Sequence, residues 1–196
     1  MRDTYRPDLF APPSPLAAAL SQWPARAWVA AAALLTLGLM AWLQWLGRWW
    51  VGPGGLYVWD NGFGGAGNSQ SLLDPYALLH LSFGTILLAV LRFYRLSWPS
   101  AMQVCAAFAG LATWEAVENV PAVIALFHPP AGASSYGGDS LLNVMGDLTA
   151  GMIGFLAARR WSLGFIVAAL ISIELLAAIM IADGLLIGSL RILGIG

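Results

Sequence analysis

A polar stretch that runs directly into an uncharged apolar segment constrains the fold of this chain more than any other feature. Residues 139–147 read Asp-Ser-Leu-Leu-Asn-Val-Met-Gly-Asp, and the eleven residues Leu148–Ala158 that follow contain no charged side chain. In a helix, Asp139, Asn143 and Asp147 fall on one face, because they are four residues apart. The pattern is typical of a membrane span with a polar stripe at one end. Because polar side chains are costly in lipid, the stripe predicts polar partners on neighbouring helices.

The composition agrees with a membrane protein. Hydrophobic residues make up 59% of the 196 residues and charged residues 10%, and the mean hydropathy is +0.74. This leaves too little polar surface for a water-soluble globule of this size. Lysine is absent and the formal net charge is −1, so the chain has no basic field for nucleic acid. The expected partners are membrane lipids, together with a lipid-linked ligand or another membrane protein, and not nucleic acid.

Five apolar segments are long enough to cross a membrane, which predicts an all-α, polytopic helix bundle. About 20 helical residues, at ~1.5 Å each, cross a hydrocarbon core of ~30 Å. Residues 1–24 are expected to form a Pro-rich tail, because Trp23-Pro24 ends any helix, and residues 25–196 a single membrane domain. An apolar tail, 185–195, is too short to span and is expected to form a surface or docked helix. The predicted spans are approximately 27–47, 76–96, 100–122, 139–158 and 161–181.

Arginine sets the expected orientation. With five spans, the N-terminal tail and the second and fourth connections share one side of the membrane and hold seven of the nine basic residues: Arg2, Arg6, Arg26, Arg92, Arg95, Arg159 and Arg160. Basic residues accumulate on the cytoplasmic side. The sequence therefore predicts a multi-pass protein of the bacterial inner (cytoplasmic) membrane with its N-terminus in the cytoplasm. The Gly-rich connection 51–75 is then outside, either as a flexible loop or folded back over a site at the membrane surface.

This topology places ionisable residues from four spans at one depth, within about 12 Å of the outer ends at ~1.5 Å per residue. Isolated charges at mid-membrane cost ~2.5–3.5 kcal/mol each, so matched depth predicts that they meet in one hydrated, outward-facing pocket. With up to five carboxylates, the pocket requires protonated carboxyls or a bound cation, and a divalent cation is a candidate cofactor. The predicted ligand-binding residues are His80, Glu115, Glu118, Asn119, Asp139, Asn143, Asp147 and Glu174.

Each of these residues also has a purely structural interpretation. Asp139 lies where a helix cap is expected. His80 has two interpretations: it hydrogen-bonds a carboxylate across a helix interface, or it acts as a metal ligand or general base. Glu115, Glu118 and Asn143 are also suited to joining helices by hydrogen bonds. A ridge of small residues, Gly146, Ala150 and Gly154, predicts close helix packing.

Five short motifs lie in order along the chain. They are Asn68-Ser-Gln70, Asp74-x-Tyr76-x-x-x-His80-x-x-x-Gly84, Trp114-Glu-x-x-Glu-Asn119-x-Pro121, Tyr136-x-Gly-Asp-Ser-x-x-Asn143-x-x-x-Asp147 and Gly154-Phe155. Together they resemble an uncharacterised family of small bacterial inner-membrane proteins, defined only as a domain of unknown function. A looser resemblance is to VanZ-like membrane proteins, which are associated with lipoglycopeptide tolerance. Both resemblances imply a bacterial inner-membrane location, and neither implies an established activity.

Three functions are compatible with these residues. The first is binding of a lipid head group or small envelope ligand in the outer pocket. The second is an intramembrane hydrolase or transferase that acts on a lipid-linked substrate, for which the candidate catalytic residues are His80, Glu115, Glu118 and Asp147. The third is a non-catalytic subunit of a larger membrane complex, in which the acidic cluster only joins helices. The sequence does not decide whether a reaction is catalysed.

Overall fold

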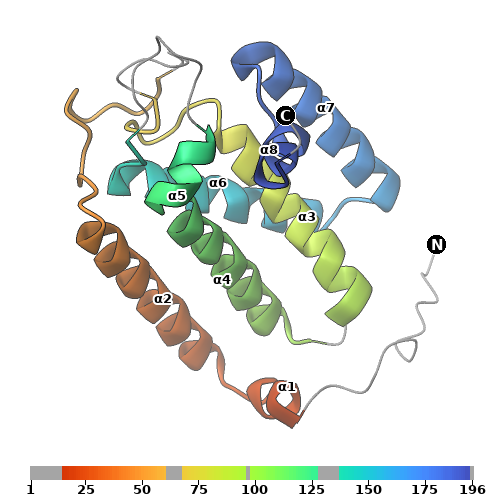
Figure 1. Ribbon diagram of the computed structural model, residues 1–196. Coiled ribbons are helices and arrows are strands. Elements are labelled where there is room, and N and C mark those ends of the chain that lie inside the picture. The colour runs from red at the N-terminus through yellow and green to blue at the C-terminus, as the bar shows by residue number, and fades with distance from the viewer. Residues whose placement is uncertain (1–14, 61–67, 96–97, 128–136, 195–196) are drawn as a thin grey trace.

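The chain folds as a helical bundle, as predicted (Figure 1). The computed structural model describes residues 15–60, 68–95, 98–127 and 137–194. Within these ranges the only β-type pairing is an isolated bridge between Trp59 and Leu73. The helices are α1 (Pro15–Leu20), α2 (Ala25–Trp45), α3 (Ala77–Arg95), α4 (Ser100–Glu118), α5 (Pro121–Ile124), the 3-10 helix η2 (Ala125–Phe127), α6 (Leu141–Ala158), α7 (Leu163–Ile181) and α8 (Leu185–Ile192).

Four of the described helices are long and apolar enough to cross a membrane: α2, α3, α6 and α7. The prediction of five spans is therefore not confirmed. The remaining predicted span, 100–122, forms α4, which ends at Glu118 rather than at residue 122, since Pro121 begins the separate helix α5. α4 lies between α2 and α3 and against α6 (Figure 1), and it buries Gln103 and Glu115 in the bundle. These two side chains thus face other helices, where lipid does not reach them.

α6 is the central helix. Figure 1 shows α2, α4 and α3 side by side, with α6 crossing behind them. One hydrophobic core joins Leu43 of α2 and Leu111 of α4 to Val144 of α6, and a second joins Leu88 of α3 to Phe155 of α6. Of the residues in α6, 61% are buried, against 11% in α2. Both cores therefore depend on α6.

Glycines allow α3 and α6 to touch along their backbones. A Cβ at Gly84 would overlap the carbonyl of Gly151, and a Cβ at Gly154 would overlap the carbonyl of Leu81. Near the start of α6, a Cβ at Gly146 would overlap the carbonyl of Leu72. The prediction that the small residues of this segment serve close packing is confirmed, because at Gly146 and Gly154 a side chain would have to displace backbone.

The ends of three helices are tied together by arginine. Arg92 of α3 donates to the carbonyls of Arg159 and Trp161, which follow α6, and Arg159 donates to Ser100 Oγ at 2.8 Å, at the start of α4. The second and fourth connections, which the arginine count placed on one side of the membrane, therefore lie together.

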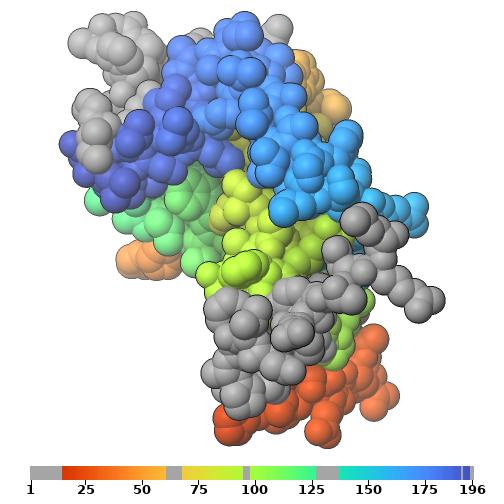
Figure 2. Space-filling view, turned by 90° about the vertical axis from the view of Figure 1, so that its right-hand side faces the viewer, coloured from red at the N-terminus to blue at the C-terminus, as the bar shows by residue number. Residues whose placement is uncertain are grey.

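A short helix lies near each end of the described chain. Within the predicted Pro-rich tail, Pro15–Leu20 form the short helix α1, so the prolines there do not exclude a helix; residues 1–14 lie outside the described part. At the other end, α8 packs against η2, which confirms the expected docked helix. Figure 2 shows α8 beside α7, with the η2 region below it.

Candidate functional site

The start of α6 is held by the two described flanks of the Gly-rich connection. Ser140 is the N-cap: its Oγ accepts from the Asn143 amide at 3.2 Å. The amides of Leu141 and Leu142 donate to the carbonyls of Trp49 and Trp50, at 2.9 and 3.1 Å. These bonds satisfy amides that a helix start otherwise leaves unpaired. α6 therefore begins at Leu141, and the prediction that Asp139 lies inside the helix or caps it is wrong.

The second flank, residues 68–74, binds the same helix start. The Ser69 carbonyl accepts from the Ser140 amide at 3.0 Å, and the Ser71 carbonyl accepts from Asn143 Nδ2, also at 3.0 Å. Asn143 thus joins two segments, in line with its structural interpretation. Tyr57 and Trp59 are exposed. Residues 61–67, the centre of the Gly-rich connection, lie outside the described part.

Asn119 and Asp139 form a reciprocal pair beside this helix start. Asn119 Nδ2 donates to Asp139 Oδ2 at 2.7 Å, and the Asp139 amide donates to Asn119 Oδ1 at 2.9 Å. Arg48 donates to the carbonyls of Asn119 and Gly137. Gly138 has a φ of +98°, and a Cβ there would overlap the Arg48 guanidinium. Both residues of the pair were predicted to bind ligand, and here they position the loop that enters α6.

Asp74 is a buried carboxyl that sequence reasoning did not assign to the site. Its two oxygens accept from the amides of Ser69 and Tyr76, both at 2.8 Å. Burial raises the pKa of Asp74 from 3.8 to about 6; the two amides oppose this rise, and the charges of Asp139 and Asp60 add to it. The signal available in the sequence was Asp74-Pro75 directly before a span, a pairing typical of a turn.

The centre of the site is His80 of α3, placed between carboxyls of two other helices. Its Nδ1 lies 3.1 Å from Glu115 Oε1 of α4, and its Nε2 lies 3.8 Å from Asp147 Oδ2 of α6. These three side chains are each at most 8% exposed. Glu118, one turn from Glu115, is partly exposed, and ligand atoms of His80, Glu115 and Glu118 all lie within 4.8 Å of one another. Three helices therefore bring together four of the predicted residues.

This centre has more hydrogen-bond acceptors than donors. A neutral imidazole carries one N–H, yet carboxylates face both nitrogens of His80. Within the described residues, Glu115 Oε2, Glu118 Oε2 and Asp147 Oδ1 are buried without a hydrogen-bond partner. Buried charge requires compensation by an opposite charge or by protonation. The arrangement therefore suits a bound cation, shared protons, or both.

Glu174 does not join this centre. Its two oxygens accept from the amides of Leu185 and Leu186, at 3.0 and 2.9 Å, at the start of α8. A carboxylate is favourable at a helix N-terminus, where amides point outward. The prediction that Glu174 faces the same pocket is corrected accordingly: ionisable side chains converge from three helices, not four, because matched depth does not determine the direction in which a helix presents a residue.

The fold and this centre define a helical bundle with four helices suited to a membrane and a buried His–carboxylate cluster. Residues 43–194 match the family described as Protein of unknown function (DUF2585). UPF0314 proteins are similar: one from Sphingopyxis alaskensis is 32% identical over 166 residues, 84% of this chain and 88% of the relative. One from Rhizobium meliloti is 30% identical, covering 75% of each chain, and one from Paracoccus denitrificans is 30% identical, covering 78% of this chain and 79% of the relative. The chain belongs to this uncharacterised bacterial family.

These matches agree with the family resemblance carried by the motifs. The looser resemblance to VanZ-like proteins is not shown by them and stays a prediction. No solved structure matches the chain significantly.

Proposed function

We propose that this protein is a multi-pass protein of the bacterial inner membrane, with a cytoplasmic N-terminus, that binds a cell-envelope ligand at an outward-facing acidic centre. The centre consists of His80, Glu115, Glu118 and Asp147. The observation that carries the proposal is the set of buried, unpaired carboxylate oxygens that α4 and α6 bring close to one imidazole of α3. Because the centre is rich in negative charge, the group that it recognises is a cation or carries one.

The two ends of the bundle support this orientation. His80 lies in the first turn of α3 and Arg92 in the last, ~18 Å apart at ~1.5 Å per residue. The Arg92–Arg159 contacts thus mark the end opposite to the acidic centre, as expected if that end faces the cytoplasm.

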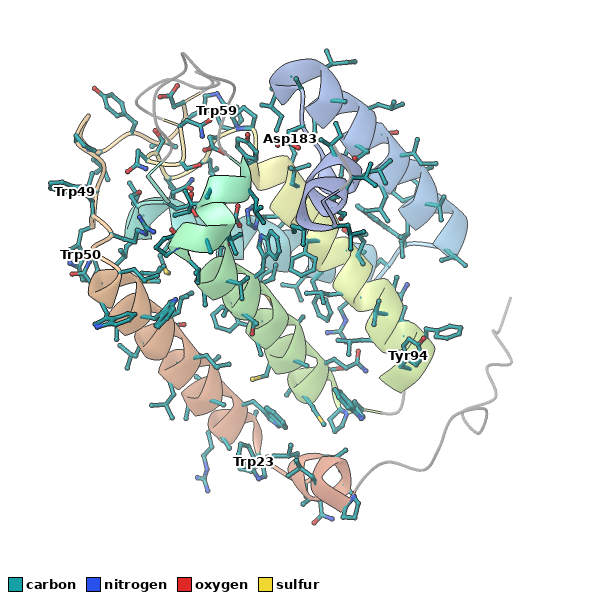
Figure 3. All side chains as sticks on the ribbon, in the orientation of Figure 1. Trp23, Trp49, Trp50, Trp59, Tyr94 and Asp183 are labelled. Carbon is teal, nitrogen blue, oxygen red and sulfur yellow. The ribbon has the colours of Figure 1, made fainter. Side chains whose placement is uncertain are left out.

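Exposed aromatic side chains also lie at both ends. Figure 3 places Trp23 and Tyr94 near one end of the bundle, and Trp49, Trp50 and Trp59 near the other. All five are exposed. Two separated aromatic groups are the arrangement found at the two interfaces of a membrane.

A second candidate is a hydrolase or transferase that acts on a lipid-linked substrate. Glu118 favours it, because this residue alone among the four is partly exposed and therefore accessible to a substrate. Glu118 would act as general base, with His80 assisting. In this proposal ligand binding is the first step of the reaction, so the same substitutions test both candidates.

The test is genetic complementation combined with analysis of bound ligand. In a strain that lacks the gene, Glu115→Gln and Asp147→Asn are expected to fail to restore the growth or envelope phenotype that the wild-type gene restores. Glu174→Gln is the matched control, since it makes the same chemical change at the α8 cap. Mass spectrometry of protein extracted in lipid nanodiscs would then identify a molecule enriched with the wild type and lost from both centre variants. Full complementation by normally folded centre variants would overturn the proposal, and a stoichiometric protein partner would favour a non-catalytic subunit.

A further inference from the structure

We propose that the cation at this centre is a divalent transition-metal ion, coordinated by His80 Nδ1, Glu115 and Glu118, with Asp147 outside the coordination sphere. The inference rests on the proposed function, since it names the chemical class of the positive charge that the centre holds. It is carried by four side chains of α3, α4 and α6 whose distances and unpaired atoms fit metal coordination.

The ligand distances fit one shared ion. Metal–ligand bonds to imidazole nitrogen and carboxylate oxygen are ~2.0–2.2 Å long, so neighbouring ligand atoms around an ion stand about 3.0–3.4 Å apart and opposite ones about 4.2 Å apart. His80 Nδ1 and Glu115 Oε1 are 3.1 Å apart. The set of His80, Glu115 and Glu118 lies within 4.8 Å. This separation exceeds the ~4.2 Å between opposite ligands by about 0.6 Å, so a side-chain shift of that order brings the three residues to one ion.

Asp147 has the position of an orienting residue. It faces Nε2, the imidazole nitrogen on the other side of the ring from Glu115, at 3.8 Å. A metal-bound histidine usually donates its second N–H to a carboxylate or carbonyl, which selects the tautomer that leaves the other nitrogen free for the metal. With Nδ1 on the ion and Nε2–H toward Asp147, both nitrogens of His80 have a favourable partner. Without a cation or an additional proton, one nitrogen lone pair would face a carboxylate.

The donor set selects the class of metal. Two carboxylates balance the charge of a divalent ion, which removes the repulsion that opposes burying Glu115 close to Glu118. An imidazole ligand disfavours Ca²⁺ and Mg²⁺, which take oxygen ligands, and favours Mn²⁺, Fe²⁺, Co²⁺ or Zn²⁺. Three protein ligands leave at least one coordination position open. Because Glu118 is the partly exposed ligand of the three, an oxygen of an envelope ligand would enter the open position from its side.

Metal binding to the full-length protein tests this inference directly. Protein purified in detergent, stripped with chelator and dialysed, is titrated with Mn²⁺, Co²⁺ and Zn²⁺ by calorimetry, and its metal content is measured by plasma mass spectrometry. The expected result is about one ion per chain, with a Co²⁺ absorption spectrum indicating mixed nitrogen and oxygen ligands. His80→Asn and Glu115→Gln are expected to abolish binding. Asp147→Asn is expected to keep the stoichiometry and weaken affinity roughly 10–100-fold. Glu174→Gln should bind as the wild type does.

A second measurement guards against variants that do not fold. Each metal that binds only the folded protein must raise its melting temperature in a concentration-dependent way. The rise should occur for the wild type and for Glu174→Gln, and should be absent for His80→Asn. The inference would be overturned if the wild-type protein binds no divalent ion. It would also be overturned if His80→Asn binds the ion as tightly as the wild type does. If no ion binds but the centre variants still lose complementation, the metal is rejected and the proposed function stands. If the wild-type protein binds the ion but the centre variants still complement fully, the proposed function fails instead.

Discussion

α6 and α7 are consecutive helices that are both able to cross a membrane, yet the protein uses them in opposite ways. α7 is the more apolar of the two, and 17% of it is buried, whereas 61% of α6 is buried. α6 carries Asn143, Asp147 and the glycines that touch α3; α7 presents large apolar side chains such as Ile179 outward. In lipid, apolar surface needs no cover, so small and polar residues are the ones turned inward. The less apolar span is therefore the centre of the fold.

The largest expected effect comes from removing a large side chain from each helix. Phe155 of α6 is completely buried, while Ile179 of α7 is largely exposed. Phe155→Ala should lower the free energy of unfolding by ~3–5 kcal/mol, because it removes packing and leaves a cavity. Ile179→Ala should change it by no more than about 0.5 kcal/mol. Denaturant unfolding in detergent measures both, and equal losses would contradict the assignment of α7 to the periphery.

The next effect concerns glycine on the same two helices. Gly154→Ala forces a methyl group against the Leu81 carbonyl. It should lower the free energy of unfolding by about 3 kcal/mol, since the backbones of α3 and α6 are packed together and must move apart. Gly164→Ala on α7 has open space around it and should be neutral or stabilise by up to ~1 kcal/mol. Thermal unfolding compares the two; a stable Gly154→Ala protein would show that α3 and α6 are not in backbone contact.

A pH effect is expected at the polar end of α6, from Asp74. Because the pKa of Asp74 rises from 3.8 to about 6 on folding, the folded protein holds more protons than the unfolded chain between these values. The contribution of Asp74 to stability is therefore largest at low pH and is lost as pH rises from about 4 to 6, by roughly 3 kcal/mol at most. Asp74→Asn removes this dependence, so the stability of the variant relative to wild type should increase over that window. A difference independent of pH would show that Asp74 is not buried as a carboxyl.

The smallest perturbation tests which end of the bundle faces outward. Tyr57→Cys lies at the acidic end and is exposed, and Arg160→Cys lies at the arginine end. The natural Cys105 is buried and should react little. A membrane-impermeant maleimide should label Tyr57→Cys in intact spheroplasts and Arg160→Cys only after lysis, with no loss of stability in either. The reverse labelling would place the acidic centre on the cytoplasmic side.

Much of the site followed from the sequence because it depends on spacing within helices. His80, Glu115, Glu118 and Asp147 were predicted to converge, and the structure brings these four together. Helical depth, counted in residues, was enough to choose them. The same count failed for Glu174, which lies at a suitable depth but caps α8. Depth is a coordinate along the helix only, and the side of α7 that faces its neighbours depends on packing.

Residues in the connections were harder to predict. Asp74 accepts from backbone amides of its own turn, and Arg48 donates to carbonyls far along the chain, so no periodic pattern marks either residue. The prediction of five spans was not confirmed for a related reason. The length of α4 suits a span, and its buried polar residues Gln103 and Glu115 are tolerated because α2, α3 and α6 pack against it. Whether a half-polar helix is surrounded in this way depends on contacts that are distant in sequence.

The sequence by itself determined that the chain is helical, that most of its long helices suit a membrane, and where their ends lie to within a few residues. It did so because backbone groups in lipid must bond within their own segment, which links apolar run length directly to helix formation. Tertiary structure alone decided that α6 is central, that Asn119 and Asp139 pair with each other, and that His80 lies between Glu115 and Asp147. These outcomes depend on which faces of separate helices meet, and that is set by the packing of the whole bundle.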